Sequence, residues 1–152
     1  VETSYRLVHT AMIAACLDRG IACELATEGE LQRPRPAERW CFAVPGCSDI
    51  RTNRGKLFGS AQRRVTRPRS RVLHHGSLVL RRPQLTPFVA AAADALRIDE
   101  HAIAQLHDAI ASRLAAALGL TLMPGSLTAD ELNRANQLKT ERYCNDAFTH
   151  RL

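Results

Sequence analysis

RGKLFGSAQRRVTRPRSRVLHHGSLVL, at residues 54–80, is the stretch that predicts the centre of the fold. Its two apolar ends, residues 56–58 and 72–80, are typical of strands. Each strand also carries small residues, Gly59-Ser60-Ala61 in the first and Gly76-Ser77 in the second. A glycine inside a strand usually marks a bulge or the close approach of another backbone or a ligand. Because the two glycines lie in neighbouring strands, we expect them to share one pocket.

The connection between these strands is rich in arginine. Residues 50–93 contain no Asp or Glu, so the net charge of +6 is concentrated in this part of the chain. Such a field favours an anionic ligand or an acidic protein partner. A solvated connection explains the basic run at 63–71 equally well, and both interpretations stay open.

Helical patterns lie on both sides of this centre. Gly20 is expected to end the first helix, and Asp99 and Gly119 to bound the longest one. Thr128, with Glu131 three residues later, predicts the start of the last helix. The expected helices are residues 4–19, 87–96, 100–118 and 129–141, and the expected strands are 21–26, 40–44, a short one after 47–50, one from 56 onward and 72–80. The fold class is therefore α+β, an antiparallel-rich sheet flanked by helices.

The length and composition predict one globular domain. A chain of 152 residues can bury a core, and 45% hydrophobic with 24% charged residues is ordinary for a soluble protein. We expect a single domain over residues 1–152, with 124–152 as a C-terminal helix and tail. Residues 1–15 lack the basic lead and long apolar run of a signal peptide, and no segment approaches the roughly 18 apolar residues of a membrane span. A cytoplasmic protein is expected.

The cysteines predict neither a metal site nor a disulfide framework. Five of them occur at irregular spacings without a C-x-x-C pair. We expect reduced thiols, most of them structural, and no metal. The five are Cys16, Cys23, Cys41, Cys47 and Cys144, and no role is expected for four of the histidines, His9, His101, His107 and His150.

Four short motifs follow one another along the chain: Cys41-Phe42, Ser48-Asp49-Ile50, GKLFGSAQRR at 55–64, and His74-His75-Gly76-Ser77-Leu78. Together they resemble the biotin/lipoate protein ligase family. Within it they look like the lipoate-protein ligase and octanoyltransferase branch, whose members carry a Lys three residues before a Gly-Ser-Ala strand motif and then a His-Gly-Ser or His-Gly-Thr strand. The resemblance implies the biotinyl/lipoyl protein ligase-like fold, and only its second, C-terminal half. Nothing here matches the Arg-Arg-x-x-Gly-Gly type motif of the first half, so a fragment, or a chain that a partner completes, is expected.

Lys56 is the first candidate for catalysis. An ammonium on a rigid strand beside Gly59 is placed to hold an acyl carbonyl or phosphate oxygen as negative charge develops. In the family, the matching lysine contacts the activated acyl group. A lone strand lysine would more often be a solvated charge, and the surrounding motif favours the catalytic role. The resemblance implies that Gly59, Ser60 and Ala61 line the acyl tunnel, with a β-bulge or tight packing as their alternative role.

Cys41 is the second candidate for catalysis. In octanoyltransferases that act through an acyl-enzyme, the Cys of a Cys-Phe pair at this position is the nucleophile. A thiolate near a lysine and a basic loop would have a lowered pKa. Cys41 and Lys56 would then pass an acyl group as a thioester without ATP. The alternative is a cysteine buried beside Trp40 and Phe42 in an apolar strand, and both interpretations stay open.

The remaining candidates are substrate-binding residues. His74 and His75 alternate faces of their strand, so only one of them looks into the pocket. We expect His75, with Gly76-Ser77, to shape the pocket wall. Asp49 matches an acidic position of the ligases. The turn at 45–48 lacks the Arg-Asn that ligases often place before it, which weakens the ATP-dependent interpretation.

The resemblance implies an acyltransferase or ligase that attaches octanoyl or lipoyl groups to the lysine of a carrier domain. The implied ligands are lipoate or an octanoyl group, with ATP and Mg if the chain is a ligase. The implied partners are an acidic lipoyl domain or acyl carrier protein and a separate N-terminal half. One alternative is a non-catalytic or partner-requiring fragment. Another is a basic nucleic-acid-binding module, which the 5% aromatic content supports poorly, since bases stack on aromatic side chains.

Overall fold

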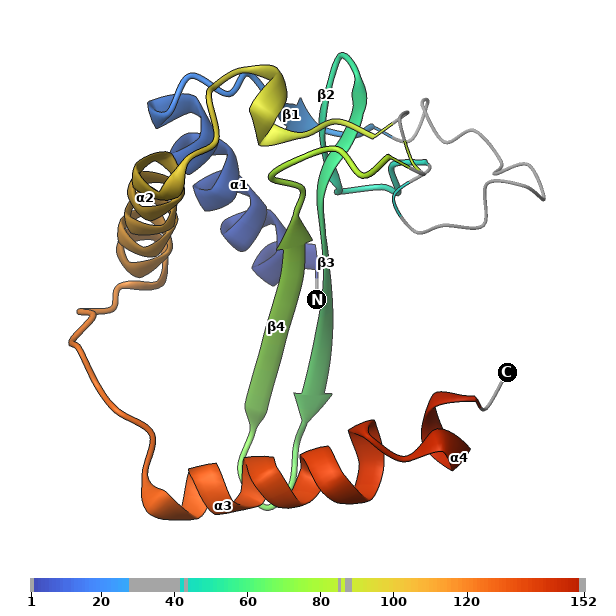
Figure 1. Ribbon diagram of the computed structural model, residues 1–152. Coiled ribbons are helices and arrows are strands. Elements are labelled where there is room, and N and C mark those ends of the chain that lie inside the picture. The colour runs from blue at the N-terminus through green and yellow to red at the C-terminus, as the bar shows by residue number, and fades with distance from the viewer. Residues whose placement is uncertain (1, 28–41, 43, 85, 87–88, 151–152) are drawn as a thin grey trace. The chain divides into compact units, whose positions relative to one another are not determined.

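The computed structural model describes residues 2–27, 42, 44–84, 86 and 89–150 (Figure 1). The chain divides into two compact units, Val1–Thr121 and Leu122–Leu152. Each is described by itself. The single domain expected over 1–152 stays a prediction.

A four-stranded antiparallel sheet forms the middle of the first unit. The strands follow one another in the order β1-β2-β3-β4. They are β1 (Glu24–Leu25), β2 (Ile50–Thr52), β3 (Gly55–Val65) and β4 (Arg71–Leu78). The long hairpin of β3 and β4 pairs from Phe58 with Leu78 to Val65 with Arg71. This meander, with the helices beside it in Figure 1, confirms the expected α+β class.

A bulge at the start of β3 sets which side chains reach which face. Ile50 pairs with Phe58 and Arg51 with Lys56, so Leu57 has no residue opposite it on β2. The alternation of side chains is broken at a bulge. Leu57 and Phe58 are consequently both in hydrophobic clusters with residues of the helices. The Lys56 ammonium lies instead beside Gly59, one residue beyond Phe58.

Two helices pack on one another against the sheet. They are α1 (Glu2–Asp18) and α2 (Glu100–Leu118). Gly20, at φ 76°, takes the chain out of α1 in the left-handed conformation that glycine adopts at no steric cost. Asp99 caps α2 by accepting from the backbone N–H of Ala102, and Gly119 ends it at φ 65°. These ends are the ones that the sequence predicts.

The core lies between the helices and the sheet. Leu57 is fully buried, as is Ile50 on the neighbouring strand. Burial of a side chain of this size contributes about 1.5–3 kcal/mol. One buried cluster comprises Cys16, Ile21, Leu57, Ala90, Ala92, Ile98 and Leu106, and a second comprises Met12, Ile50 and Phe58.

The helix expected over 87–96 is wrong. Of its described residues, only Ala92–Asp94 form a 3-10 turn, η3. The backbone here bonds to β3 and to the residue just after β4 instead. The N–H of Ala90 donates to the Lys56 carbonyl at 3.2 Å, and that of Ala92 to the Val79 carbonyl at 2.9 Å. Both alanines are fully buried. Their small size lets the segment pack against the strands, and this tertiary packing overrides alanine's helix propensity.

Other expected boundaries shift. The strand expected at 21–26 is only β1, and the last strand ends at Leu78 rather than Leu80. The strand expected at 40–44 falls mostly outside the described residues. Cys41, the second candidate for catalysis, lies outside them.

The second unit begins with a well-capped helix. It contains α3 (Ala129–Leu138), the π-helical turn η4 (Lys139–Tyr143) and α4 (Asp146–Thr149). Thr128 and Glu131 form the expected capping box, each side chain accepting from the other's backbone N–H. The helix expected at 129–141 is thus present, with a π-turn as its last part. None of the helices in the described part of the chain is long and apolar enough to cross a membrane.

Candidate functional site

A buried ion pair joins Lys56 to Asp49. The Lys56 Nζ lies 2.7 Å from Asp49 Oδ2, and the two side chains are only 9% and 14% exposed. The backbone N–H of Gly46 donates to the same carboxylate oxygen at 2.6 Å. The Phe42 ring lies against the ammonium, with its centroid 4.9 Å from Nζ. A charge pair with this much desolvation needs such additional contacts, because the cost of burying two charges otherwise exceeds their attraction.

Gly59 makes room for this pair. A Cβ at position 59 would lie 2.6 Å from Lys56 Cε, 2.7 Å from Nζ and 3.2 Å from Asp49 Oδ1. The two separations from Lys56 are far shorter than a van der Waals contact, so a side chain at position 59 would force the end of Lys56 to move. The sequence analysis expected another backbone or a ligand near this glycine, and the described neighbours are side chains. The group that approaches is the catalytic candidate itself.

Gly76 has a different reason to be glycine. Its Cβ would lie 2.5 Å from Cζ of the Phe58 ring and 2.9 Å from the Gly59 carbonyl oxygen. The residue lets β4 pack against the core ring and against β3. Its role in the described structure is packing at the sheet.

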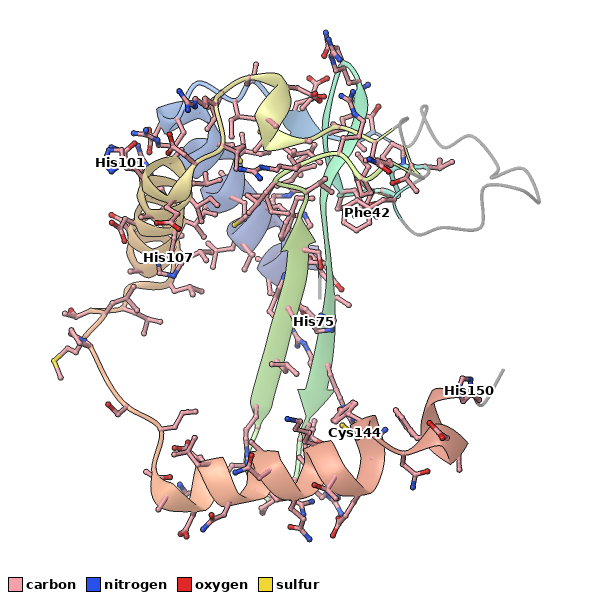
Figure 2. The ribbon with its side chains drawn as sticks, in the orientation of Figure 1. Phe42, His75, His101, His107, Cys144 and His150 are labelled. Atoms are coloured by element: carbon pink, nitrogen blue, oxygen red, sulfur yellow. The ribbon has the colours of Figure 1, made fainter. Side chains whose placement is uncertain are left out.

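The expected site residues are divided between the two faces of the hairpin. Gly59 pairs with Ser77 and Ala61 with His75, whereas Ser60 pairs with Gly76. Residues directly opposite one another share a face, and neighbours along a strand alternate. Ala61, His75 and Ser77 are therefore on the Gly59 face, where all three are exposed. Figure 2 shows His75 midway along the hairpin and Phe42 near the end of β3 that lies away from the hairpin turn.

Ser60, on the opposite face, is bonded to a histidine that the sequence analysis left without a role. His9 of α1 is 1% exposed, and its Nδ1 donates to the Ser48 carbonyl. Because that acceptor fixes the proton on Nδ1, Nε2 accepts from Ser60 Oγ, at 2.6 Å. Burial lowers the pKa of His9, against the opposing effects of the Ser48 bond and the Asp49 charge. Burial therefore favours the neutral imidazole.

The hydrogen bonds continue along the hairpin. Since Ser60 donates its one hydroxyl proton to His9, it accepts from His74 Nε2 at 2.9 Å. His74 Nδ1 then accepts from Gln62 Nε2 at 2.8 Å, and Gln62 Oε1 accepts from Ser4 Oγ at 3.0 Å. Arg64 donates to Ser4 at 3.2 Å. Burial, and next the charges of the other histidines, lower the pKa of His74. Every hydrogen bond in this series is donated in the same direction, so the series ties α1 to the hairpin in one arrangement.

The helical spacing could have revealed His9. It lies four residues after Tyr5 and three before Met12, so it is on the apolar face of the first helix. A polar residue on such a face requires a buried hydrogen-bond partner. The sequence gives no sign of which partner, because the serines are about 40 and 50 residues away.

A mainly apolar cavity of about 400 Å³ lies on the Ser60 face. His74 supplies its polar edge, and Gly76 lies at its wall. Its lining is Val8, Met12, Phe58, His74, Gly76, Leu78, Ile110, Leu114 and Leu118. The cavity and the Lys56 ammonium are on opposite faces of the sheet, so the two glycine sites do not share one pocket.

Among curated proteins, the chain is similar to two octanoyltransferases named LipM. It is 31% identical to that of Kyrpidia tusciae over 177 residues and 29% identical to that of Symbiobacterium thermophilum over 176. Each alignment covers 99% of this chain and 62% of the relative, so the chain spans about three fifths of the length of the relatives it matches. No protein-family model matches the chain.

Solved structures share the fold. A lipoate protein ligase from T. acidophilum with bound lipoic acid superimposes with a TM-score of 0.76 at 15% identity, over 99% of this chain and 58% of its own. Lipoate-protein ligase A bound with ATP gives 0.74 at 15%, over 97% and 58%. In sequence the chain is similar to octanoyltransferases, and in fold it is similar to lipoate-protein ligases. Proteins with these names make up the lipoate-protein ligase and octanoyltransferase branch that the sequence motifs resemble. A third structure contains a bi-partite lipoate protein ligase and its E2 lipoyl domain, from Thermoplasma acidophilum, and gives 0.68 at 14%, over 96% and 56%.

Proposed function

We propose that the chain is the C-terminal part of an enzyme that attaches octanoyl or lipoyl groups to the lysine of a lipoyl-bearing carrier domain. The observation that carries the proposal is the buried Lys56–Asp49 pair, for which Gly59 leaves room. An ammonium held in place before the reaction stabilises developing negative charge better than a mobile surface lysine does. The proposal keeps the cytoplasmic location expected from the sequence.

In the first version of the reaction, Cys41 carries the acyl group. Its thiolate attacks the carbonyl carbon of an acyl thioester, and the donor thiol leaves as the new thioester forms. The carrier lysine then attacks that carbonyl, the Cys41 thiolate leaves, and the amine loses a proton to give the amide. Lys56 would hold the carbonyl oxygen in both steps. Phe42, the neighbour of Cys41 in sequence, supports this version because its ring lies against the Lys56 ammonium.

In the second version, the chain acts with ATP. Lys56 would then hold an oxygen of an acyl-adenylate, and the fold is shared with a ligase solved with ATP. A magnesium ion would require oxygen ligands. Asp49 is engaged by Lys56 and Gly46, and among the residues that the structure describes no group of three or more His, Cys, Asp or Glu could hold a metal ion.

Two surfaces fit the partners expected from the sequence. Five arginines at the end of the hairpin are exposed and suit an acidic carrier domain: Arg63, Arg64, Arg67, Arg69 and Arg71. The outer edge of β4 pairs with no strand among the described residues, and an edge strand readily accepts another strand. If the catalytic domain is made of two chains, a separate first half would extend the sheet along this edge of β4.

Intact mass after incubation with an octanoyl-carrier protein, and separately with lipoate and ATP, tests the proposal. A hydroxylamine-labile octanoyl adduct that Cys41→Ala abolishes supports the thioester version. A tightly held lipoyl-adenylate without that adduct supports the ligase version. Lys56→Ala should remove transfer by either route, while Lys139→Ala, at the other lysine of the chain, should not. Full transfer by Lys56→Ala would overturn the assignment of the site.

A further inference from the structure

Ser60 and His9 form a hydroxyl–imidazole pair on the helix-covered face of the sheet. The Ser60 Oγ donates to His9 Nε2 at 2.6 Å. The other ring nitrogen of His9 donates to the Ser48 carbonyl, and the side chain is only 1% exposed, so the ring is held from both sides. A serine bonded to a base that a third group orients is the arrangement that activates a hydroxyl as a nucleophile.

The carbonyl that orients His9 belongs to a residue in an uncommon conformation. Ser48 has φ 73°, in the left-handed region that residues with a side chain seldom adopt. Residues in such conformations cluster at functional sites. In this pair the Ser48 carbonyl takes the place that a carboxylate has in the serine hydrolases, because it fixes the tautomer of the imidazole.

His74 lies on the other side of the same hydroxyl. Its Nε2 donates to Ser60 Oγ at 2.9 Å, while its Nδ1 accepts from Gln62 Nε2 at 2.8 Å. When Ser60 attacks a carbonyl group, this N–H would be close to the carbonyl oxygen, which becomes negative. A donor fixed in advance at such an oxygen stabilises the transition state. His9 and His74 therefore suit the roles of base and of hydrogen-bond donor.

The apolar cavity of about 400 Å³ begins beside Ser60, which is itself partly exposed. Three of its lining residues surround the serine on the sheet: Phe58 two residues before it, Gly76 directly opposite and His74 diagonally opposite. The lining also follows α2 from Ile110 to Leu118, about 12 Å at 1.5 Å per residue, which matches a straight chain of about ten carbon atoms. A largely apolar cavity of this size with few polar groups is typical of a small-molecule site.

We propose that Ser60, with His9 as its base, hydrolyses esters of straight-chain carboxylic acids of medium length, whose acyl chain occupies this cavity. The site lies on the face of the sheet opposite the Lys56 ammonium, and the proposal does not depend on the acyl-transfer function. It gives a chemical role to a contact that also ties α1 to the hairpin.

The reaction has two steps. The Ser60 Oγ attacks the ester carbonyl carbon while its proton passes to His9 Nε2. The C–O bond to the alcohol breaks, and the alcohol oxygen takes that proton, which leaves an acyl ester on Ser60. A water molecule then attacks the same carbon and gives a proton to His9, and the Ser60 oxygen leaves with this proton. One ester and one water thus become one carboxylic acid and one alcohol.

Hydrolysis of p-nitrophenyl esters by the purified chain tests the proposal. Wild-type protein should hydrolyse the octanoate faster than the acetate, and a fluorophosphonate with a straight alkyl chain should label Ser60 in peptide mapping. Ser60→Ala should abolish both, and His9→Gln should slow both by about 100-fold or more. Ser112→Ala, at an exposed serine of α2, should change neither.

Leu114→Phe tests the cavity and does not require an unchanged stability. The larger side chain would fill part of the cavity, so the ratio of octanoate to acetate hydrolysis should fall by about 10-fold. This ratio is independent of the fraction of protein that is folded.

Three results would overturn the proposal. One is a folded wild-type chain in which the fluorophosphonate leaves Ser60 unlabelled. Another is hydrolysis by Ser60→Ala at the wild-type rate. The last is an unchanged preference for octanoate in Leu114→Phe, since it would mean that the acyl chain does not occupy the cavity.

Discussion

Replacing Gly59 with alanine would displace the Lys56 ammonium without breaking the sheet. The new Cβ would lie 2.6 Å from Lys56 Cε and 2.7 Å from Nζ. Ordinary contacts begin near 3.4 Å, so the end of the lysine must move by about 1 Å. That movement breaks the 2.7 Å contact with Asp49. Because the clashing atoms are at the flexible end of a side chain, the strand itself need not shift.

The two effects of this change differ in size. Overpacking and the loss of a buried charge contact should lower the free energy of unfolding by about 1–3 kcal/mol. A displacement of about 1 Å at a reacting group can slow the chemistry by about 100-fold. We therefore expect Gly59→Ala to remain folded and to lose most of its acyl transfer. Urea unfolding and the rate of octanoyl transfer, measured on the same preparation, separate the two effects.

Two other glycines serve as controls. Gly76→Ala places a Cβ 2.5 Å from the Phe58 ring and 2.9 Å from backbone oxygen, neither of which can swing away, so its loss should be mainly in stability. Gly125 has nothing within 4 Å of such a Cβ, so Gly125→Ala should change neither quantity. Wild-type transfer by Gly59→Ala, or a loss of transfer that merely follows a loss of stability as large as that of Gly76→Ala, would refute the reasoning.

Three further changes test other parts of the structure. Asp49→Asn leaves the buried Lys56 charge without its counterion and should lower the free energy of unfolding by about 3–5 kcal/mol in urea denaturation, and Lys56→Met in the same chain should restore part of it. Because burial lowers the pKa of His9, the unfolded chain binds more protons than the folded one below its usual pKa of about 6.5, so stability should fall as the pH falls below that value, and His9→Asn should reduce this slope in urea unfolding at a series of pH values. Arg67→Glu with Arg69→Glu, on the exposed hairpin end, should leave Tm unchanged, slow association with an acidic carrier domain by about 10-fold or more, and flatten its dependence on salt.

Each of these expectations has an opposite outcome. Asp49→Asn as stable as wild type would mean that the ion pair contributes nothing to the folded state. An unchanged pH slope in His9→Asn would assign the acid sensitivity to other groups, His74 among them. Carrier association that is as fast and as salt-dependent after both arginines are reversed would exclude the hairpin end as the docking surface.

The sequence predicted those parts of the fold that depend on local chemistry. Gly20, Asp99 and Gly119 end or begin helices because their backbone angles or side chains suit helix ends wherever the helix packs. The hairpin was also predictable, since its two strands are close in sequence. The run at 87–96 failed because alanine favours a helix and also fits under a sheet, and only the packing decides between them.

The geometry of the candidate site was less predictable. The motif puts Lys56, Gly59 and Ser60 close together on one strand. Regular alternation would place Lys56 and Ser60 on the same face, but the bulge at Leu57 puts Lys56 on the Gly59 face, opposite Ser60. A bulge depends on how two strands pair, which single residues do not reveal. The same is true of Gly76, whose need for a missing Cβ comes from the Phe58 ring.

The segment before β2 explains how these separate contacts act together. The Ser48 carbonyl accepts from His9, the Asp49 carbonyl accepts from the N–H of Ala26, and the Asp49 carboxylate accepts from the N–H of Gly46. Asp49 is thus held from α1, from the end of β1 and from its own turn. Since Asp49 in turn holds the Lys56 ammonium, the position of the catalytic candidate is set by three parts of the fold rather than by its own strand. Disturbing any one of them should shift Lys56 without removing it, which is why changes at His9 are expected to alter transfer as well as stability.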